Sequence, residues 1–142
     1  MRVRGHVYRL FVELERAPRT VEVAAELGLA RGEVEASFRR LHDAHAIVLG
    51  RGSTEIRMAL PFSGVSTDVR VVANGRCWYA NCAWDGLGVL ASLGADGRLL
   101  THCSDCDDAL ELEVRGGALV PTGSVVHFVV PAARWWDDIA YT

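Results

Sequence analysis

The sequence predicts an α+β chain, with a helical module first and a small mixed or antiparallel β-sheet domain after it. Apolar residues recur at helical spacing over the first 45 positions, whereas β-branched runs and glycine-containing turns dominate after residue 68. All four cysteines lie in the second half. The chain has 142 residues, about half of them apolar, which is enough for one good core or two smaller ones.

Three helices are predicted in the N-terminal module. The first covers residues 3–16, because its apolar side chains repeat on one helical face, and Pro18 ends it. Thr20 is expected to cap a second helix over residues 21–27, since its hydroxyl can accept an unpaired amide hydrogen bond. A third helix is predicted over residues 31–45, with apolar residues on one face.

Two short strands, predicted over 47–49 and 55–58, flank a glycine-rich turn and predict a β-wing. Three helices and a wing form a winged helix-turn-helix, so residues 1–58 are predicted to be a winged-helix-like module. Glu33 and Glu35 would meet DNA phosphates unfavourably at the start of the third helix. A structural module is therefore favoured over a DNA-binding one, although several arginines could contact a phosphate backbone.

Residues 59–67 contain Pro, Gly and Ser and are predicted to be a linker, which leaves residues 68–142 as the second domain. In that domain we expect a short helix over 81–90 and a terminal helix over 132–139. The run 125–130 is continuous and β-branched, which predicts a buried strand with His127 as a hydrogen-bonded core histidine. The other expected strands are 69–72, 77–80, 98–101 and 110–114.

The sequence contains no feature of a secreted or membrane protein. No apolar run is long enough to span a bilayer, and charges interrupt the N-terminal apolar stretch, so we expect a cytoplasmic protein without a membrane partner. In the cytoplasm, clustered cysteines are more often metal-binding or catalytic than disulfide-bonded.

Cys82 and Asp85 are the sharpest local feature. On a helical turn this spacing places the thiol and the carboxyl on one face, with Cβ atoms about 5–6 Å apart. A thiolate is a soft-metal ligand, and a carboxyl held in an apolar site keeps its proton near neutral pH. By spacing alone, a buried structural cysteine beside a helix-end aspartate remains the commoner interpretation.

Four segments resemble the organomercurial (alkylmercury) lyase family: ALPFS at 59–63, WYANCAWD at 78–85, THC at 101–103 and GSVV at 123–126. The resemblance implies protonolysis of a carbon–mercury bond, which gives a hydrocarbon and Hg(II). It implies that Cys82 holds mercury, that Asp85 relays the proton and that Cys103 is structural. An enzyme is therefore favoured, with an organomercurial as its small-molecule partner and no organic cofactor. A winged-helix-like module before the catalytic domain is also usual in that family.

The resemblance also implies a second mercury-binding cysteine, shortly after a segment that corresponds to residues 135–142. By this register the cysteine would follow Thr142, where the sequence ends, so a form truncated at its C-terminus is one interpretation. With one thiolate we expect Hg(II) to be held less tightly and cleavage to be slow. A cellular thiol could supply the missing ligand.

The four cysteines also allow a metal site of their own. Cys77 and Cys82 form a C-x4-C pair, and Cys103 and Cys106 form a C-x2-C pair about twenty residues later, which approximates zinc-ribbon spacing. Such a site would bind Zn(II), Cu(I) or Hg(II). The alternative function is therefore a metal-responsive winged-helix transcriptional regulator or a Zn/Cu-binding protein.

Overall fold

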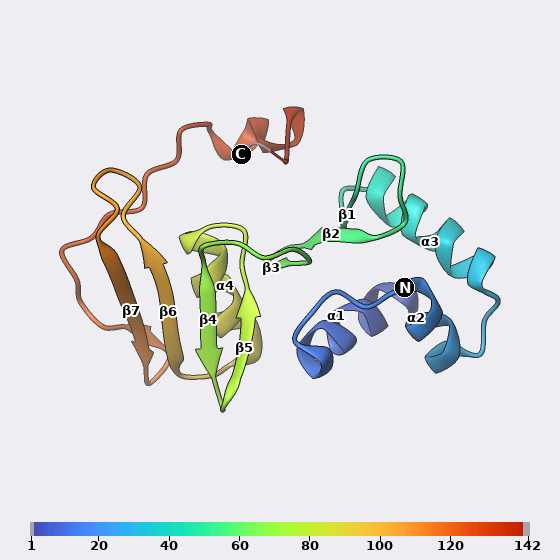
Figure 1. The fold of residues 1–142 in the computed structure, drawn as a ribbon, viewed down its shortest axis with the longest axis horizontal. Coiled ribbons are helices and arrows are strands. Elements are labelled where there is room, and N and C mark those ends of the chain that lie inside the picture. The colour runs from blue at the N-terminus through green and yellow to red at the C-terminus, as the bar shows by residue number, and fades with distance from the viewer. Residues whose placement is uncertain (1, 141–142) are drawn as a thin grey trace.

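The protein has a mixed α+β architecture with two antiparallel sheets (Figure 1). The computed structural model describes residues 2–140. Three helices and a small sheet come first in the chain, and a larger sheet covered by one helix follows. The predicted α+β class is thus confirmed.

The three N-terminal helices are α1 (Arg2–Leu14), α2 (Thr20–Leu27) and α3 (Arg31–Asp43). Their predicted positions are confirmed, but the predicted cap of α2 is wrong. Thr20 is buried in the first turn, and the cap is Arg19, whose backbone N–H donates to the Glu22 carboxylate at 2.7 Å. The Glu22 side chain, on the first turn of α2, thus pairs the backbone N–H of the residue that precedes the helix, as in a capping box.

A three-stranded antiparallel sheet follows, in the order β1 (Val48–Leu49), β2 (Ile56–Ala59) and β3 (Phe62–Ser63). β3 lies inside residues 59–67, so the segment expected to be a linker is packed into the fold. The glycine content of residues 59–67 suggested a flexible linker, but a Cβ on Gly64 would lie 2.1 Å from the backbone oxygen of Ile56. That glycine permits close packing rather than flexibility. The division into two domains at this segment stays a prediction.

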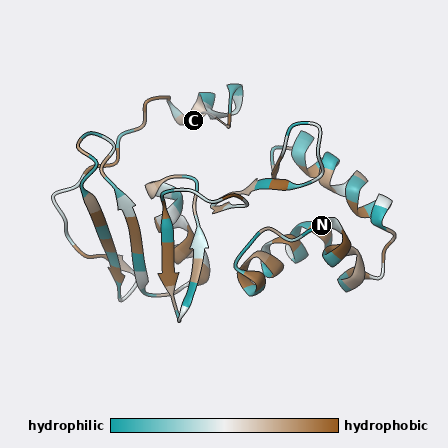
Figure 2. Cartoon of the chain, in the orientation of Figure 1, coloured by the Kyte–Doolittle hydropathy of each residue, from teal (hydrophilic) through white to brown (hydrophobic). Residues whose placement is uncertain are grey.

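The larger sheet has the order β5-β4-β6-β7-β8, with every neighbouring pair antiparallel. Helix α4 (Ala83–Leu93) packs on it through contacts to β4 and β6. Figure 2 shows hydrophobic residues along these central strands and on α4. The strands are β4 (Arg70–Ala73), β5 (Arg76–Tyr79), β6 (Gly97–His102), β7 (Ala109–Arg115) and β8 (Ala118–Leu119).

The helices and the larger sheet share one hydrophobic core. The buried indole of Trp78 on β5 donates to the backbone oxygen of Phe11 on α1 at 3.2 Å. Phe11 also stacks on Phe62, with 5.5 Å between ring centroids. These contacts fix β5, and therefore the chain that leaves it, against the N-terminal helices.

The predicted buried strand over 125–130 is wrong. Within the described residues this run forms no strand, and Val125 and Val129 are 88% and 79% exposed. A β-branched run becomes a buried strand only where a neighbouring strand offers hydrogen bonds, and the described sheet ends at β8. His127 is exposed as well, so it is not a core histidine. The terminal helix is a 3-10 helix, η1 (Ala132–Asp137).

Among residues 2–140, no helix is both long enough and apolar enough to cross a membrane.

Candidate active site

Cys82 lies at the N-terminal end of α4, where the chain leaves the sheet. After β5 ends, the Ala80 N–H donates to the Val69 oxygen at 3.0 Å, and the Thr67 hydroxyl donates to the Ala80 oxygen at 2.6 Å. Cys82 then takes an extended conformation as the N-cap of the helix. Its sulfur accepts the Asp85 backbone N–H at 3.4 Å, which is the role that a serine or aspartate oxygen usually has at this position.

Asp85 is half-buried on the first turn of α4, and its side chain faces the thiol. Asn81 Nδ2 donates to Asp85 Oδ2 at 3.0 Å, and the thiol of Cys82 is a second donor to the carboxylate. Burial raises the pKa of Asp85 above its ordinary value, and the hydrogen bonds from Asn81 and Cys82 offset this rise only in part. A carboxyl in this setting can accept and return a proton at a pH closer to neutrality than an exposed one can.

The thiol of Cys82 is held in its neutral form by the same surroundings. Burial raises its pKa, the Asp85 backbone N–H opposes this rise, and the negative charge of Asp85 adds to it. A soft cation that binds the sulfur must therefore displace a proton. Asp85 is the adjacent group that can receive that proton.

Gly86 allows α4 to lie close to the sheet. A Cβ on this residue would lie 2.0 Å from Leu99 Cδ1 on β6 and 3.3 Å from Val69 Cγ1, and both neighbours are buried. This close approach sets the distance between the first turn of α4 and the sheet, and therefore the positions of Cys82 and Asp85. Trp84 points outward instead and is 54% exposed, with an edge-on contact to Phe128 at 6.0 Å.

The family model for alkylmercury lyase (MerB) matches residues 62–142, which is more than half of the chain. The chain belongs to the alkylmercury lyase family. The crystal structure of the mercury-bound form of MerB2 resembles the fold with a TM-score of 0.66 and 22% sequence identity. The likeness covers 85% of this chain and 59% of that one, so the chain spans about three fifths of the MerB2 chain. No curated protein sequence matches it.

The other cysteines are not gathered around Cys82 in this alkylmercury lyase family member. Cys77 is half-buried on β5, and its backbone N–H donates to the carboxylate of Glu15, the residue after α1, at 3.0 Å. Cys103 and Cys106 lie in the β6–β7 hairpin. Among residues 2–140, no three His, Cys, Asp or Glu side chains are placed to hold one metal ion. The predicted four-cysteine metal site is therefore not formed in the described part of the chain.

Asn81 is the neighbour of the site that sequence reasoning missed. It lies four residues before Asp85, a spacing that lets an amide reach a carboxylate across the start of a helix. The segment expected to precede a second family cysteine, 135–142, is described as far as residue 140, and Tyr141 and Thr142 lie outside the described residues.

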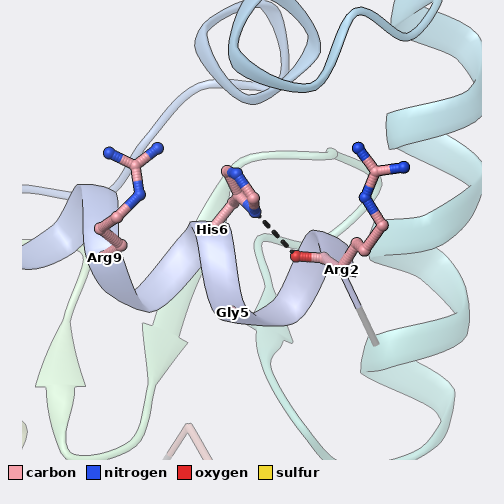
Figure 3. A pocket seen from close by; sticks show the side chains of 4 residues that line it. All are labelled: Arg2, Gly5, His6 and Arg9. Atoms are coloured by element: carbon pink, nitrogen blue, oxygen red, sulfur yellow. Dashed lines mark hydrogen bonds between the residues drawn. The ribbon is translucent and has the colours of Figure 1, made fainter.

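A shallow surface hollow occurs elsewhere, on α1. Arg2, Gly5, His6 and Arg9 line it (Figure 3). The His6 ring contacts the Arg2 backbone oxygen at 3.0 Å, and Arg9 is paired with Glu13. Neither the thiols nor Asp85 line this hollow, so it has no part in the candidate chemistry.

Proposed function

We propose that this protein cleaves carbon–mercury bonds by protonolysis, with Cys82 as the thiolate that binds mercury and Asp85 as the proton donor. The observation that carries the proposal is the pairing of the two groups on the first turn of α4. The sulfur of Cys82 accepts the backbone N–H of Asp85, and the Asp85 carboxyl beside it has a raised pKa. Membership of the alkylmercury lyase family supports the same chemistry.

The reaction can be written with all atoms accounted for. The sulfur of Cys82 bonds to mercury in R–Hg–X, and its proton passes to Asp85 as X⁻ leaves. Asp85 then donates that proton to the carbon, so the carbon–mercury bond breaks and R–H departs. Electron donation from sulfur weakens the bond to carbon, while the acid protonates the developing carbanion. Mercury stays divalent throughout.

After R–H has left, Hg(II) on Cys82 needs a second ligand. We propose that a cellular thiol R'–SH supplies it, giving Cys82–S–Hg–S–R' and returning one proton to Asp85. Metal–thiolate bonds form with loss of the thiol proton, which is why an adjacent carboxylate helps. The cytoplasm, where thiols are kept reduced, is the compartment that suits this step.

The test is benzene release from phenylmercury in the presence of excess thiol. We expect the wild-type chain to release benzene and the Cys82→Ala variant to fall to the level of thiol alone. Cys77→Ser is the matched control, because this half-buried cysteine lies on β5, outside the site. Wild-type benzene release no higher than that of Cys82→Ala would end the lyase proposal.

We also propose that residues 1–58 are a winged-helix-like module that packs on the sheet instead of binding DNA. Supporting this, Glu35 on α3 is paired with Arg31 at 2.7 Å and lies 4.0 Å from Arg39, so these arginines already have an acidic partner. The contact of Trp78 with α1 ties the module to the sheet. A gel shift at low salt should show no complex with duplex DNA; a salt-sensitive complex would contradict this role.

A further inference from the structure

The β6–β7 hairpin carries two thiols that the proposed lyase reaction does not use. Residues 103–108 connect the two strands. The backbone N–H of Cys103 donates to the backbone oxygen of Asp108 at 2.8 Å and closes the hairpin. The Asp107 N–H donates back to the Cys103 oxygen at 2.9 Å, so residues 103–107 form a single helix-like turn. Cys103 and Cys106 are three residues apart in this turn and therefore lie on one side of it.

The sheet register places this pair at the same edge as Cys82. Tyr79 on β5 and Leu100 on β6 are both opposite Arg70 on β4. Both strands are antiparallel to β4, so they leave the sheet in the same direction, with axes about 10 Å apart. Cys82 follows Tyr79 by three residues, and Cys103 follows Leu100 by three. Figure 1 shows the β6–β7 loop at the end of the sheet where α4 begins.

The donor set around the pair favours a cation that needs only two thiolates. No third His, Cys, Asp or Glu of residues 2–140 completes a site with them, whereas structural Zn(II) is held by four ligands. Soft two-coordinate cations such as Hg(II) are satisfied by two sulfurs. The hairpin is also accessible, since Cys106 is exposed and Cys103 is partly exposed.

We propose that Cys103 and Cys106 form a second Hg(II) site, a two-thiolate acceptor that takes Hg(II) from Cys82. The source of the Hg(II) rests on the proposed lyase function, but the site itself does not. The exchange balances: Cys82–S–Hg–S–R' and the two hairpin thiols give Cys103–S–Hg–S–Cys106, the free thiol of Cys82 and R'–SH. No oxidation or reduction is involved, and Cys82 is freed for another turnover.

The two hairpin thiols differ in their pKa shifts: the pKa of Cys106 is raised, and that of Cys103 is lowered. The backbone N–H groups of Cys106 and Asp105 lower the pKa of Cys103, which favours its thiolate. A thiolate is the form that attacks a metal already bound to another sulfur.

Inorganic Hg(II) tests the site without any organomercurial. The variant Cys77→Ser/Cys82→Ser keeps only the hairpin thiols, and the matched control adds Cys106→Ser to it. Each is mixed with HgCl2 in excess monothiol, desalted and analysed for mercury. We expect about one Hg per chain in the first and little in the control, because two linked thiols outcompete separate ones. Equal retention in both variants would overturn the proposal.

Transfer of Hg(II) from Cys82 to the hairpin is tested in the wild-type chain, so that no substitution can disturb folding. One equivalent of HgCl2 is added with monothiol, free thiols are alkylated, and the labelled cysteines are identified by mass spectrometry. We expect Cys82 to be labelled, with Cys103 and Cys106 protected. Protection of Cys82 with labelling of the hairpin pair would refute the acceptor role. A chain that fails the benzene assay but passes these two assays would lose the lyase proposal and keep the hairpin site.

Discussion

Cys82 and Cys103 follow strands that end on the same side of one sheet, each three residues after a position opposite Arg70, yet their pKa values are shifted in opposite directions. Burial at the start of α4 raises the pKa of Cys82, whereas backbone N–H groups in the exposed hairpin lower the pKa of Cys103. The first thiol is therefore protonated and stands beside a carboxyl, while the second is biased towards thiolate. The local surroundings, more than the residue type, therefore set how readily a cysteine ionises and reacts.

The two regions also differ in how firmly they are held. α4 packs on β4 and β6 with Gly86 against Leu99, and so its first turn is fixed by the core. The hairpin loop is held by its own backbone hydrogen bonds, such as those between Cys103 and residues 107 and 108. Changes to the core should therefore affect the Cys82 site and spare the hairpin.

The largest effect is expected from Asp85→Asn. An amide cannot donate the proton that the leaving carbon needs, so benzene release should fall by about 10²- to 10⁴-fold. Mercury retention by the hairpin pair should stay the same, because Asp85 is not part of that turn. Asp43→Asn, which removes an exposed carboxylate at the end of α3, is the charge-matched control. Full activity in Asp85→Asn would show that another group protonates the carbon.

Asp85→Asn should lower activity but should not lower the stability of the fold. Because the pKa of Asp85 is raised in the folded protein, the folded state binds its proton more tightly than the unfolded state does. Stability therefore falls as pH rises from the ordinary aspartate range through the raised pKa, and the penalty persists above it. Asp85→Asn removes that penalty, so its thermal midpoint at pH 7 should equal or exceed that of the wild type. A lower midpoint at pH 7 would contradict the burial argument.

Gly86→Ala is expected to be the next largest change. The new Cβ would lie 2.0 Å from Leu99 Cδ1, and Leu99 is fully buried, so α4 must shift or the core must rearrange. We expect a loss of about 1–3 kcal/mol in the free energy of unfolding, measured by urea denaturation, together with reduced benzene release. Hairpin mercury retention should persist. Gly5→Ala is the control, because nothing lies within 4 Å of its Cβ position.

The sequence predicted most where the signal is local. Helical periodicity located α1 to α3, and the three-residue spacing of Cys82 and Asp85 anticipated their pairing at the start of α4. It failed where a partner distant in the sequence decides the outcome. The run 125–130 has the composition of a buried strand, but composition does not reveal whether a neighbouring strand exists. In the same way, Gly64 suggested a flexible linker, although the approach of Ile56 is what requires it.

The candidate site shows the same limit. Asn81 was missed because the four-residue spacing to Asp85 is common, and only the turn between β5 and α4 brings the amide to the carboxylate. The four-cysteine site failed because the sheet places Cys77 within β5 and the hairpin pair at the end of β6. Spacing along the chain suggested one zinc-ribbon-like cluster, but no three of these side chains are placed to hold one metal ion within residues 2–140.

A moderate effect is expected in alkylation kinetics. At pH 7, iodoacetamide should modify Cys103 several times faster than Cys82, because the thiolate is the reactive form and the pKa of Cys103 is lowered while that of Cys82 is raised. As pH rises above the ordinary cysteine range, Cys82 ionises and the two rates should converge. Peptide mass spectrometry over a pH series measures both rates in one sample. Faster modification of Cys82 than of Cys103 at pH 7 would contradict the opposite pKa shifts of the two thiols.

The smallest effect is expected from Asp108→Asn in the hairpin. The Asp108 backbone N–H lowers the pKa of Cys106. The Asp108 carboxylate, which accepts a hydrogen bond from Cys106 Sγ at 3.3 Å, raises it, and so does the neighbouring Cys103. These two effects outweigh the first, so the pKa of Cys106 is raised. The substitution keeps the N–H and removes the carboxylate charge, which should lower the pKa of Cys106 and modestly increase its alkylation rate at pH 7. Asp107→Asn is the matched control, because it removes one charge from the same loop and asparagine tolerates the φ of 61° there. Equal increases in both variants would mean that the overall charge of the loop, and not the Cys106–Asp108 hydrogen bond, controls this thiol.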